Sequence, residues 1–231
     1  MFLASFPSGA WQSNCYIAGA ADQSDVVVID PGDGALAPLR EVMTDEQLTP
    51  VAVLLTHGHF DHVASAAEFA DAYGIPVHIH PADRELLSDP AAGVSRESAA
   101  MLAQLLPVTG LVEPADVRDL ADGQLLDLAG ITFRVVHAPG HRPGCVMFLM
   151  PHPDDPFSSV AFTGDVLFAG SIGRTDLPGG SMPDMVATLR DVVLELPDDT
   201  ALLPGHGPQT TMVAERATNP YLQPDFLRSA L

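Results

Sequence analysis

Three histidines and an aspartate lie within six positions of the segment LLTHGHFDHV (residues 54–63), namely His57, His59, Asp61 and His62. They follow the apolar run VAVLLT (51–56), which predicts a strand covered on both faces. Imidazole nitrogens and carboxylate oxygens are common ligands of zinc. On an extended loop, His57 and His59 point the same way, whereas Asp61 and His62 start a helix and diverge. The segment therefore predicts ligands for one metal ion and, beside it, for a second.

Three further strand ends each deliver a residue of the same kind next to a glycine. His141 lies in APGHRPG, Asp165 follows SVAFTG (159–164), and His206 lies in LLPGHG. Glycine allows tight turns and close approach of other groups. If these ends converge, five imidazoles and two carboxylates meet, a set that is costly to bury without metal. Around a pair of divalent cations the set would form a catalytic centre with a shared hydroxide as nucleophile.

The remaining histidines lack this context. His78 and His80 in VHIH are interpreted as one exposed strand face, and His152 in MPHPDDP as a loop residue. His137 shares a strand face with apolar residues of ITFRVVH (131–137), which favours a structural role. We expect none of these histidines to bind metal.

Short strands dominate the predicted elements. Helical periodicity predicts helices over 34–43, 62–73, 96–107 and 181–196, the last capped by Ser181. Apolar or alternating runs predict strands over 14–19, 25–30, 51–56, 75–80, 131–137, 145–150, 159–164 and 200–205, with QLLDL pairing with 131–137 as a hairpin. Because no low-complexity linker divides the chain, we expect one domain over residues 1–231, built from two similar β-rich halves with helices outside.

Composition excludes several classes of partner. The net charge is −20, and all ten basic residues are arginine, which argues against nucleic acid as a partner. No apolar stretch is long enough for a membrane span, and the amino terminus lacks the basic region of a secretory signal. Cys15 and Cys145 do not imply a disulfide framework, so we expect a cytoplasmic protein. The pattern does not define an oligomeric state.

The combined motifs resemble a known family. THGHFDH (56–62), APGHRPG, TGD (163–165) and PGHG (204–207) are similar to the metallo-β-lactamase superfamily, and GDVLFAGSIGRTDLPGG (164–180) resembles its glyoxalase II-like (hydroxyacylglutathione hydrolase-like) branch. The resemblance runs from about Asn14 to His206. It implies an α+β fold, the αββα sandwich with two central mixed sheets and helices outside, and a metal site along one sheet edge.

The resemblance also implies roles for individual residues. One metal ion would be bound by His57, His59 and His141, the other by Asp61, His62 and His206, with Asp165 as the bridge. Zinc is the expected metal for both positions, although iron and manganese accept the same ligands. Asp30 matches a position that supports the metal site, with a simple turn residue as the alternative. Arg174 and Asp176 in GRTD are expected to pair and brace their loop.

The implied activity is hydrolysis of a small-molecule thioester of the S-2-hydroxyacyl kind by the metal-bridging hydroxide. Two departures from the family bear on the substrate. Arg142 stands where threonine is common in the family. It could hold a substrate carboxylate, but a role in balancing the negative charge of the acidic surface is favoured. Glyoxalase II enzymes carry an additional helical domain with basic and tyrosine contacts to glutathione. This sequence has 25 residues after His206 and no lysine, which argues against glutathione as the thiol.

Three other functions remain open at the level of sequence. Persulfide dioxygenases resemble the chain too, including a GRTD stretch, and use one iron held by two histidines and an aspartate; the DLPGG continuation favours the hydrolase. A lactone or lactam carbonyl suits the same hydroxide. A non-catalytic binding module is disfavoured because the ligand set is intact.

Overall fold

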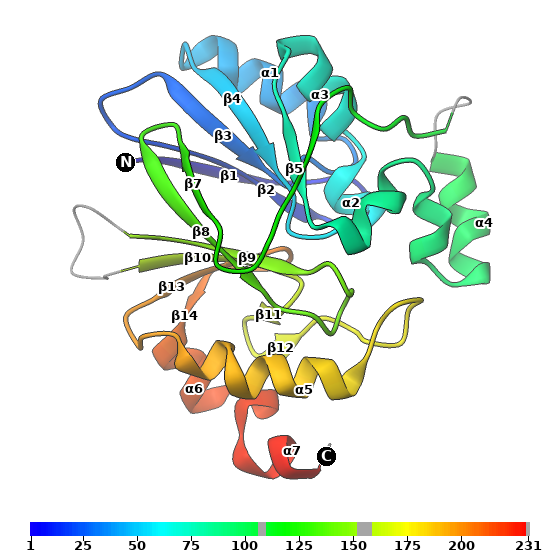
Figure 1. The fold of residues 1–231 in the computed structure, drawn as a ribbon, viewed down its shortest axis with the longest axis vertical. Coiled ribbons are helices and arrows are strands. Elements are labelled where there is room, and N and C mark those ends of the chain that lie inside the picture. Colours follow the sequence, from blue (N-terminus) through cyan, green and yellow to red (C-terminus); the bar gives the residue numbers. More distant parts are fainter. Residues whose placement is uncertain (106–109, 152–158, 230–231) are drawn as a thin grey trace.

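The computed structural model describes residues 1–105, 110–151 and 159–229. Two six-stranded sheets pack face to face, and helices cover their outer faces (Figure 1). The first sheet has the order β1-β2-β3-β4-β5-β6. Its strands are Phe2–Ser8, Ser13–Gly19, Asp25–Ile29, Thr49–Leu54, Val77–Ile79 and Val117–Asp119.

The strands that lead towards the histidine-rich segment are parallel. β3 pairs with β4, β4 with β5 and β5 with β6 in parallel, whereas β1 and β2 run antiparallel to their neighbours. The apolar runs of β3 and β4 are buried because helices cover the outer face and the second sheet covers the inner one. The end of β4 therefore delivers the residues that follow it to a fixed place at the sheet edge.

The second sheet has the order β14-β13-β10-β9-β8-β7. In chain order its strands are Leu125–Leu128, Ile131–His137, Val146–Pro151, Ser159–Gly164, Ala201–Pro204 and Thr210–Thr211, numbered β7, β8, β9, β10, β13 and β14. β10 and β13 are parallel, so their carboxyl ends lie at the same edge. A small hairpin, β11 (Leu167–Phe168) and β12 (Ser171–Ile172), follows β10.

The helices form the two outer layers. α1 (Leu36–Asp45) and α3 (Ala66–Tyr73) lie on the first sheet, and α5 (Met182–Asp191), α6 (Met212–Thr218) and α7 (Pro224–Ser229) lie on the second sheet's side (Figure 1). α2 (Phe60–Val63) begins in the histidine-rich segment, and α4 (Arg96–Leu105) stands at one side of the molecule. Short 3₁₀ turns complete the helical segments: η1 (Pro81–Leu87), η2 (Pro90–Gly93), η3 (Val193–Glu195) and η4 (Pro220–Leu222).

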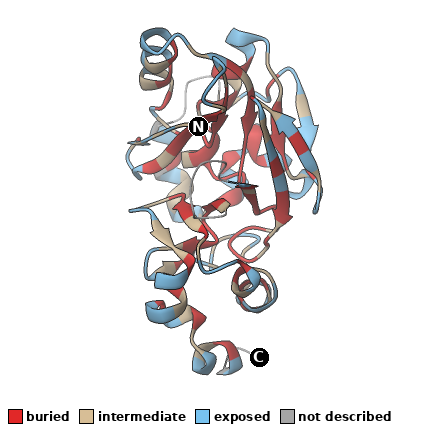
Figure 2. Ribbon diagram, turned by 90° about the vertical axis from the view of Figure 1, so that its left-hand side faces the viewer, coloured by how far each residue is buried: buried red, intermediate tan, exposed pale blue. Residues whose placement is uncertain are grey.

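The hydrophobic core lies in three layers. The central cluster joins both sheets and includes Tyr16 of β2 with Phe133, Phe148 and Phe162 of the second sheet. Separate clusters lie under the helices of each side. Figure 2 shows these buried residues gathered along the sheets, with exposed residues on the outer helical turns. The predicted αββα sandwich of the α+β class is confirmed.

One predicted helix is wrong in detail. The expected helix over 62–73 is two helices, α2 and α3, because Ser65 does not continue the helical hydrogen bonding. Its amide donates to the carbonyl of Pro31 at 3.0 Å and its hydroxyl to that of Gly32 at 2.6 Å. The carbonyl of Asp61, which a continuous helix would use here, instead accepts from the Ser13 hydroxyl.

The boundaries of other predicted elements differ from the observed ones by a few residues. The strand expected over 75–80 is only β5, Val77–Ile79, and the last residues of the helix expected over 96–107 lie outside the described residues. Cys15 and Cys145 are buried free thiols. None of the helices in the described ranges combines the length and apolar character that a membrane crossing requires.

Candidate metal centre

All seven residues singled out at strand ends meet at one edge of the sandwich. His57, His59, Asp61 and His62 follow β4 of the first sheet, while three residues follow strands of the second: His141 after β8, Asp165 after β10 and His206 after β13. The two sheets thus contribute from opposite sides of one gap.

The first group of donor atoms belongs to His57, His59 and His141. His59 Nδ1 lies 3.2 Å from His57 Nε2 and 2.8 Å from His141 Nε2. Donors about 2.0–2.1 Å from zinc at tetrahedral angles are about 3.3–3.4 Å apart. The spacing is therefore close to that of ligands around a single ion.

The second group consists of Asp61, His62 and His206. His62 Nε2 lies 3.3 Å from His206 Nε2 and 3.6 Å from Asp61 Oδ2, and His206 Nε2 lies 3.2 Å from the same carboxylate oxygen. These separations also match the edges of a tetrahedron around one ion.

Asp165 stands between the groups. Its Oδ2 is 3.4 Å from His141 Nε2 of the first group, and its Oδ1 is 3.4 Å from His62 Nε2 of the second. Asp165 Oδ1 is buried and has no hydrogen-bond partner. A buried carboxylate oxygen without a partner is costly unless a cation compensates it. The residues present therefore fit a pair of divalent cations with a carboxylate placed to reach both.

Every histidine of the two groups is oriented through its other ring nitrogen. Four rings turn Nε2 towards the gap and hydrogen-bond through Nδ1, and the partners of Nδ1 are Thr56 Oγ1 for His57 (3.1 Å), Asp30 Oδ2 for His62 (2.9 Å), Arg174 O for His141 (2.7 Å) and Trp11 O for His206 (3.1 Å). His59 is reversed: its Nδ1 faces the gap and its Nε2 donates to Gly93 O at 3.0 Å. Such bonds fix the tautomer and leave the inward nitrogen with its lone pair free for a metal.

Asp30 supports this arrangement rather than occupying a turn alone. Its Oδ1 accepts the backbone N–H of Thr56 at 2.8 Å, and its Oδ2 accepts from Thr56 Oγ1 at 2.6 Å and from His62 Nδ1. The residue is 2% exposed and has a left-handed backbone with φ of 51°. This conformation costs a non-glycine residue about 1 kcal/mol or more. The hydrogen bonds of the carboxylate hold it there.

The electrostatics of the two groups differ. Burial, with the neighbouring imidazoles of His141 and His62, lowers the pKa of His59 to about 3 despite the Asp61 carboxylate. Burial alone would also lower the pKa of His62, but the carboxylates of Asp61, Asp165 and Asp30 outweigh it and raise this pKa to about 10. Burial also lowers the pKa of His57, so the neutral rings that can donate an electron pair are favoured at His57 and His59, whereas the carboxylates favour the charged ring at His62.

A cavity of about 430 Å³ opens over the two groups. Donors from both groups form part of its wall, with Asp165 between them. The rest of the wall is mainly apolar and comes from Trp11, Phe60, Val94, Leu102, Phe168 and Leu177. A substrate in this cavity would therefore lie over the donors and against a mainly apolar wall.

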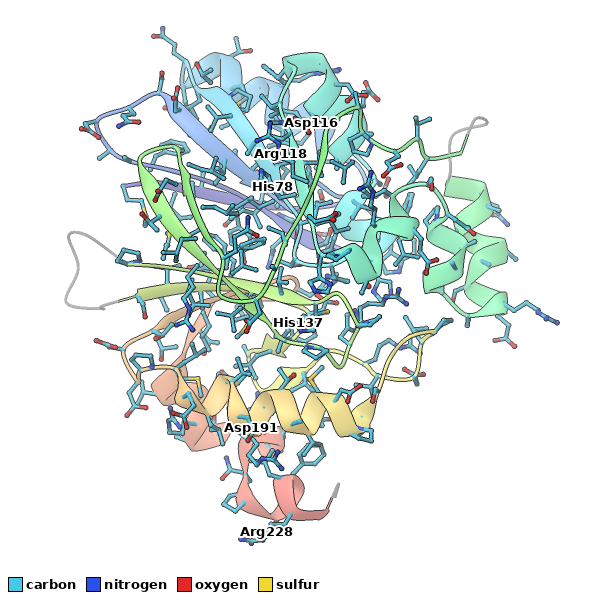
Figure 3. All side chains as sticks on the ribbon, viewed as in Figure 1. His78, Asp116, Arg118, His137, Asp191 and Arg228 are labelled. Atoms are coloured by element: carbon cyan, nitrogen blue, oxygen red, sulfur yellow. The ribbon has the colours of Figure 1, made fainter. Side chains whose placement is uncertain are left out.

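The expectation that His78 lies on an exposed strand face is wrong, although it belongs to none of the metal-type groups found among the described residues. His78 is only 4% exposed, because β5 lies between β4 and β6 and is covered on both faces. Figure 3 shows His78 near Arg118 and Asp116, well away from His137. Burial, together with Arg118, lowers the pKa of His78 to about 4, and neither ring nitrogen has a hydrogen-bond partner.

The other histidines lie outside the two groups. His80 follows the strand, and its ring stacks on that of His137 at 4.4 Å with an interplanar angle of 7°. The Nε2 atom of His137 lies 2.8 Å from the carbonyl oxygen of Pro143. Because a carbonyl oxygen can only accept, Nε2 carries the hydrogen and donates it. His152 lies outside the described residues.

Arg142 neither lines the cavity nor lies at the protein surface. The favoured interpretation, that it balances the negative charge of the acidic surface, is therefore wrong. It is 3% exposed and forms an ion pair with fully buried Asp83, with Nη2 and Oδ1 3.3 Å apart, and it donates to the Pro178 carbonyl. The Asp83 carboxylate also accepts the backbone N–H groups of Gly58 at 2.9 Å and Gly144 at 3.1 Å. The pair therefore connects both histidine-bearing loops to the loop that contains Pro178.

Arg174 and Asp176 pair as predicted. Arg174 Nε and Nη2 each donate to one carboxylate oxygen of Asp176 at 2.7 Å. Arg174 also lines the cavity, and its carbonyl orients His141.

Sequence reasoning missed Thr56, Asp83 and Trp11. A hydroxyl directly before His57, at the end of a buried strand, was the available signal for Thr56. Asp83 and Trp11 carry no local signal, since their contacts depend on segments far away in the chain.

Two mixed sheets with outer helices and a histidine–aspartate centre at their edge define a class of metallo-hydrolases. The chain belongs to the metallo-β-lactamase superfamily, whose family model matches residues 8–206. A Mycobacterium tuberculosis protein (strain H37Rv), "Uncharacterized protein Rv2581c", is 43% identical over 224 residues, 96% of this chain and 98% of its own length. "Hydroxyacylglutathione hydrolase GloC" of Haemophilus influenzae is 33% identical over 217 residues, 94% of this chain and 95% of its own.

Solved structures show the same architecture. "BLEG-1 B3 metallo-beta-lactamase" superposes with a TM-score of 0.82 at 37% identity and covers 96% of this chain and 100% of its own. "TTHA1623 in a di-iron-bound form" superposes with a TM-score of 0.76, also at 37% identity, with the same coverage. A similar fold thus holds two metal ions in that relative.

Proposed function

We propose that this protein is a dinuclear metal-dependent hydrolase that cleaves thioesters of the S-2-hydroxyacyl kind. The observation that carries the proposal is the pair of three-residue donor groups with Asp165 between them at the floor of a cavity. His57, His59 and His141 would hold one ion, and Asp61, His62 and His206 the other. The similarity to GloC supports a thioester as substrate.

When bound, a pair of divalent ions supplies a Lewis acid and a nucleophilic hydroxide near neutral pH. The protein's own residues position the metal ligands and exclude bulk water. The ring hydrogen bonds to Thr56, Asp30, Arg174 and Trp11 keep the lone pairs aimed inward, and Asp165 spans the two groups. The aromatic and aliphatic wall excludes bulk water from the carbonyl that is attacked.

Among the described residues, the cavity wall offers no rival nucleophile. Ser98 is the one described wall residue with a hydroxyl, and its Oγ accepts from Ser95 Oγ at 3.0 Å rather than approaching a histidine. Cys145 is buried, and burial raises the pKa of its thiol well above the usual value. A thiolate or alkoxide mechanism would need an exposed group beside a base. The free, buried thiols also agree with the reducing cytoplasm as the proposed location.

Elemental analysis and a hydrolysis assay test the proposal together. We expect about two atoms of zinc, or a mixed pair of metals, per chain and release of thiol from S-lactoyl thioesters. His59→Ala should lose the metal of the first group and reduce turnover at least about 10²-fold. His80→Ala, a histidine outside the two groups, is the matched control and should keep both.

Two results would redirect the assignment. Near-normal turnover in a metal-checked His59→Ala protein would refute the ligand set. A single iron atom per chain would overturn hydrolysis in favour of persulfide oxidation, which oxygen consumption with a persulfide would then measure.

A second candidate is hydrolysis of a lactam, because BLEG-1, a B3 metallo-β-lactamase, is 37% identical over nearly the whole chain. The same carbonyl position would serve an amide of this kind. A chromogenic cephalosporin assayed beside the thioesters separates the two: a higher kcat/KM on the lactam would displace the thioester proposal.

A further inference from the structure

The cavity wall beyond the donor groups is apolar and almost without charge. Its lining residues outside the metal-type donors are six large apolar side chains together with Ser98, Gly173 and Arg174. They come from distant parts of the chain: Trp11 follows β1, Leu102 lies on α4, and Leu177 lies after β12 (Figure 1). Trp11 packs edge-on against Phe60 with ring centroids 6.0 Å apart, so these two rings form one surface of the wall.

Almost none of the positively charged side chains of the protein line the cavity. The chain has ten arginines and no lysine, and all ten lie in the described ranges. Of these, only Arg174 lines the cavity, and Asp176 already accepts from two of its nitrogens. Arg142, next to a donor in sequence, is buried against Asp83 and does not line the cavity. No free guanidinium therefore faces a ligand from this wall.

The size of the cavity shows which half of a thioester this wall would contact. A small hydroxyacyl group occupies a minor part of 430 Å³ once its carbonyl lies over the donors. The thiol half must then lie along the apolar wall. A glutathione moiety carries two carboxylates and an ammonium group, and it would be desolvated there without partners inside a protein of net charge −20.

We infer that the substrate is a thioester of an uncharged, largely apolar thiol rather than of glutathione. This inference rests on the proposed thioester hydrolysis, which it narrows to one class of thiol. Burial of an apolar ring against the wall would provide the binding energy, and the donor groups would act on the carbonyl.

Fluorescence of Trp11 measures this preference without any turnover. Trp11 is the only tryptophan in the chain and lines the cavity, so its emission reports a bound ligand. Zinc-loaded protein is titrated with two uncleavable thioethers, benzyl methyl sulfide and S-methylglutathione, which present the same kind of sulfur to the metals. We expect the benzyl compound to bind at least about tenfold more tightly. Equal or tighter binding of S-methylglutathione would overturn the inference.

A charge placed in the wall should change the ranking. Leu177→Arg adds a free guanidinium at a half-buried wall position and should reduce the preference for the benzyl compound by about threefold or more. Leu125→Arg, at a position of β7 that is 63% exposed, is the matched control and should leave the ranking unchanged. If Leu177→Arg unfolds at a lower temperature, Val94→Arg repeats the test from another segment of the wall. An unchanged ranking in a folded wall variant contradicts the placement of the thiol.

Assays of hydrolysis with S-lactoylglutathione and with the S-lactoyl thioester of benzyl mercaptan test two things separately: that the protein hydrolyses thioesters, and that it prefers an apolar thiol. A higher kcat/KM on the benzyl thioester supports both. If the zinc-loaded protein hydrolyses neither, thioester hydrolysis fails, and the fluorescence ranking still decides which class of ligand the wall accepts.

Discussion

Among single residues, Asp83 connects the two loops that carry His57, His59 and His141 although it is not itself a donor. One carboxylate accepts the amide of Gly58, between His57 and His59, and the amide of Gly144, three positions after His141. Its charge is balanced by Arg142 alone among the described arginines. Breaking a buried pair by removing one partner is far more damaging than the net contribution of the pair suggests.

Replacing Arg142 with methionine should therefore lower the free energy of unfolding by about 3–5 kcal/mol, because the Asp83 charge stays buried without compensation. Urea unfolding measures the loss. Arg118→Met is the matched control: it removes an exposed pair with Asp116 and should cost no more than about 1 kcal/mol. The double variant Asp83→Asn with Arg142→Met should recover part of the stability. Equal losses in the two single variants would show that the buried pair does not hold the loops.

At the scale of elements, contacts from β2 and from the turn after β3 hold the segment that carries Asp61 and His62. The Asp61 carbonyl is diverted to the Ser13 hydroxyl, and the backbone of Gly32 packs directly on it. A Cβ at Gly32 would lie 1.6 Å from the Asp61 carbonyl oxygen, which is backbone and cannot rotate away. The tight approach of the turn after β3 therefore fixes the start of α2.

Gly32→Ala should displace the Asp61 segment and so weaken the second donor group. We expect fewer than about two metal atoms per chain by elemental analysis and a lowered unfolding temperature. Gly74→Ala is a suitable comparison, since Gly74 has φ of 67° but nothing within 4 Å of the added Cβ. It should cost only about 1 kcal/mol and leave the metal content unchanged. A Gly32→Ala protein with full metal content would contradict this role.

The elements that sequence patterns predicted well are those whose burial pattern is local. Near-continuous apolar runs gave β3 and β4, and the AG turn gave the hairpin of β7 and β8. β1 was missed because Phe2–Ser8 alternates weakly, contains Pro7 and forms an edge strand that depends on β2 for its pairing. The break in the helix over 62–73 was missed because its cause is a set of contacts from Ser13, Pro31 and Gly32.

At the scale of the whole molecule, the centre joins the two halves of the sandwich. Four donors belong to the first sheet's edge and three to the second's. Among the described residues, direct backbone hydrogen bonds between the halves at this edge are few, such as Asn14 N–H to Gly205 O at 2.7 Å and Val146 N–H to Thr56 O at 2.8 Å. Bound ions at this position would therefore act as a cross-link between the halves, as well as a catalytic group.

Removal of metal with a chelator should lower the unfolding temperature and speed amide exchange on both sides of the edge together. The physical reason is that donors from both sheets would then lose the ions that hold them together across the gap. Readdition of zinc should restore both measurements. Faster exchange confined to one half, with an unchanged unfolding temperature, would argue against a cross-link.

The converging strand ends made most of this centre readable in the sequence, because residue type, glycine context and strand position all agreed. What could not be read were properties that depend on three-dimensional neighbours. Burial of His78 follows from its strand lying inside the sheet, and the pairing of Arg142 follows from η1 lying under the histidine loops. The apolar wall, with Trp11 and Leu102 facing one cavity, combines segments that no motif connects.

The loop after β12 serves two purposes at once, and this has a consequence for how new activities could evolve. The carbonyl of Arg174 orients a donor ring, while Arg174 and Leu177 also form part of the wall that a ligand meets. Changes in this loop that admit a different molecule would disturb the chemistry as well. α4 contributes Ser98 and Leu102 to the same wall but none of the seven donors. Variation in α4 can therefore explore new substrates at little cost to catalysis, which makes this helix the natural place for relatives to diverge and for libraries to be aimed.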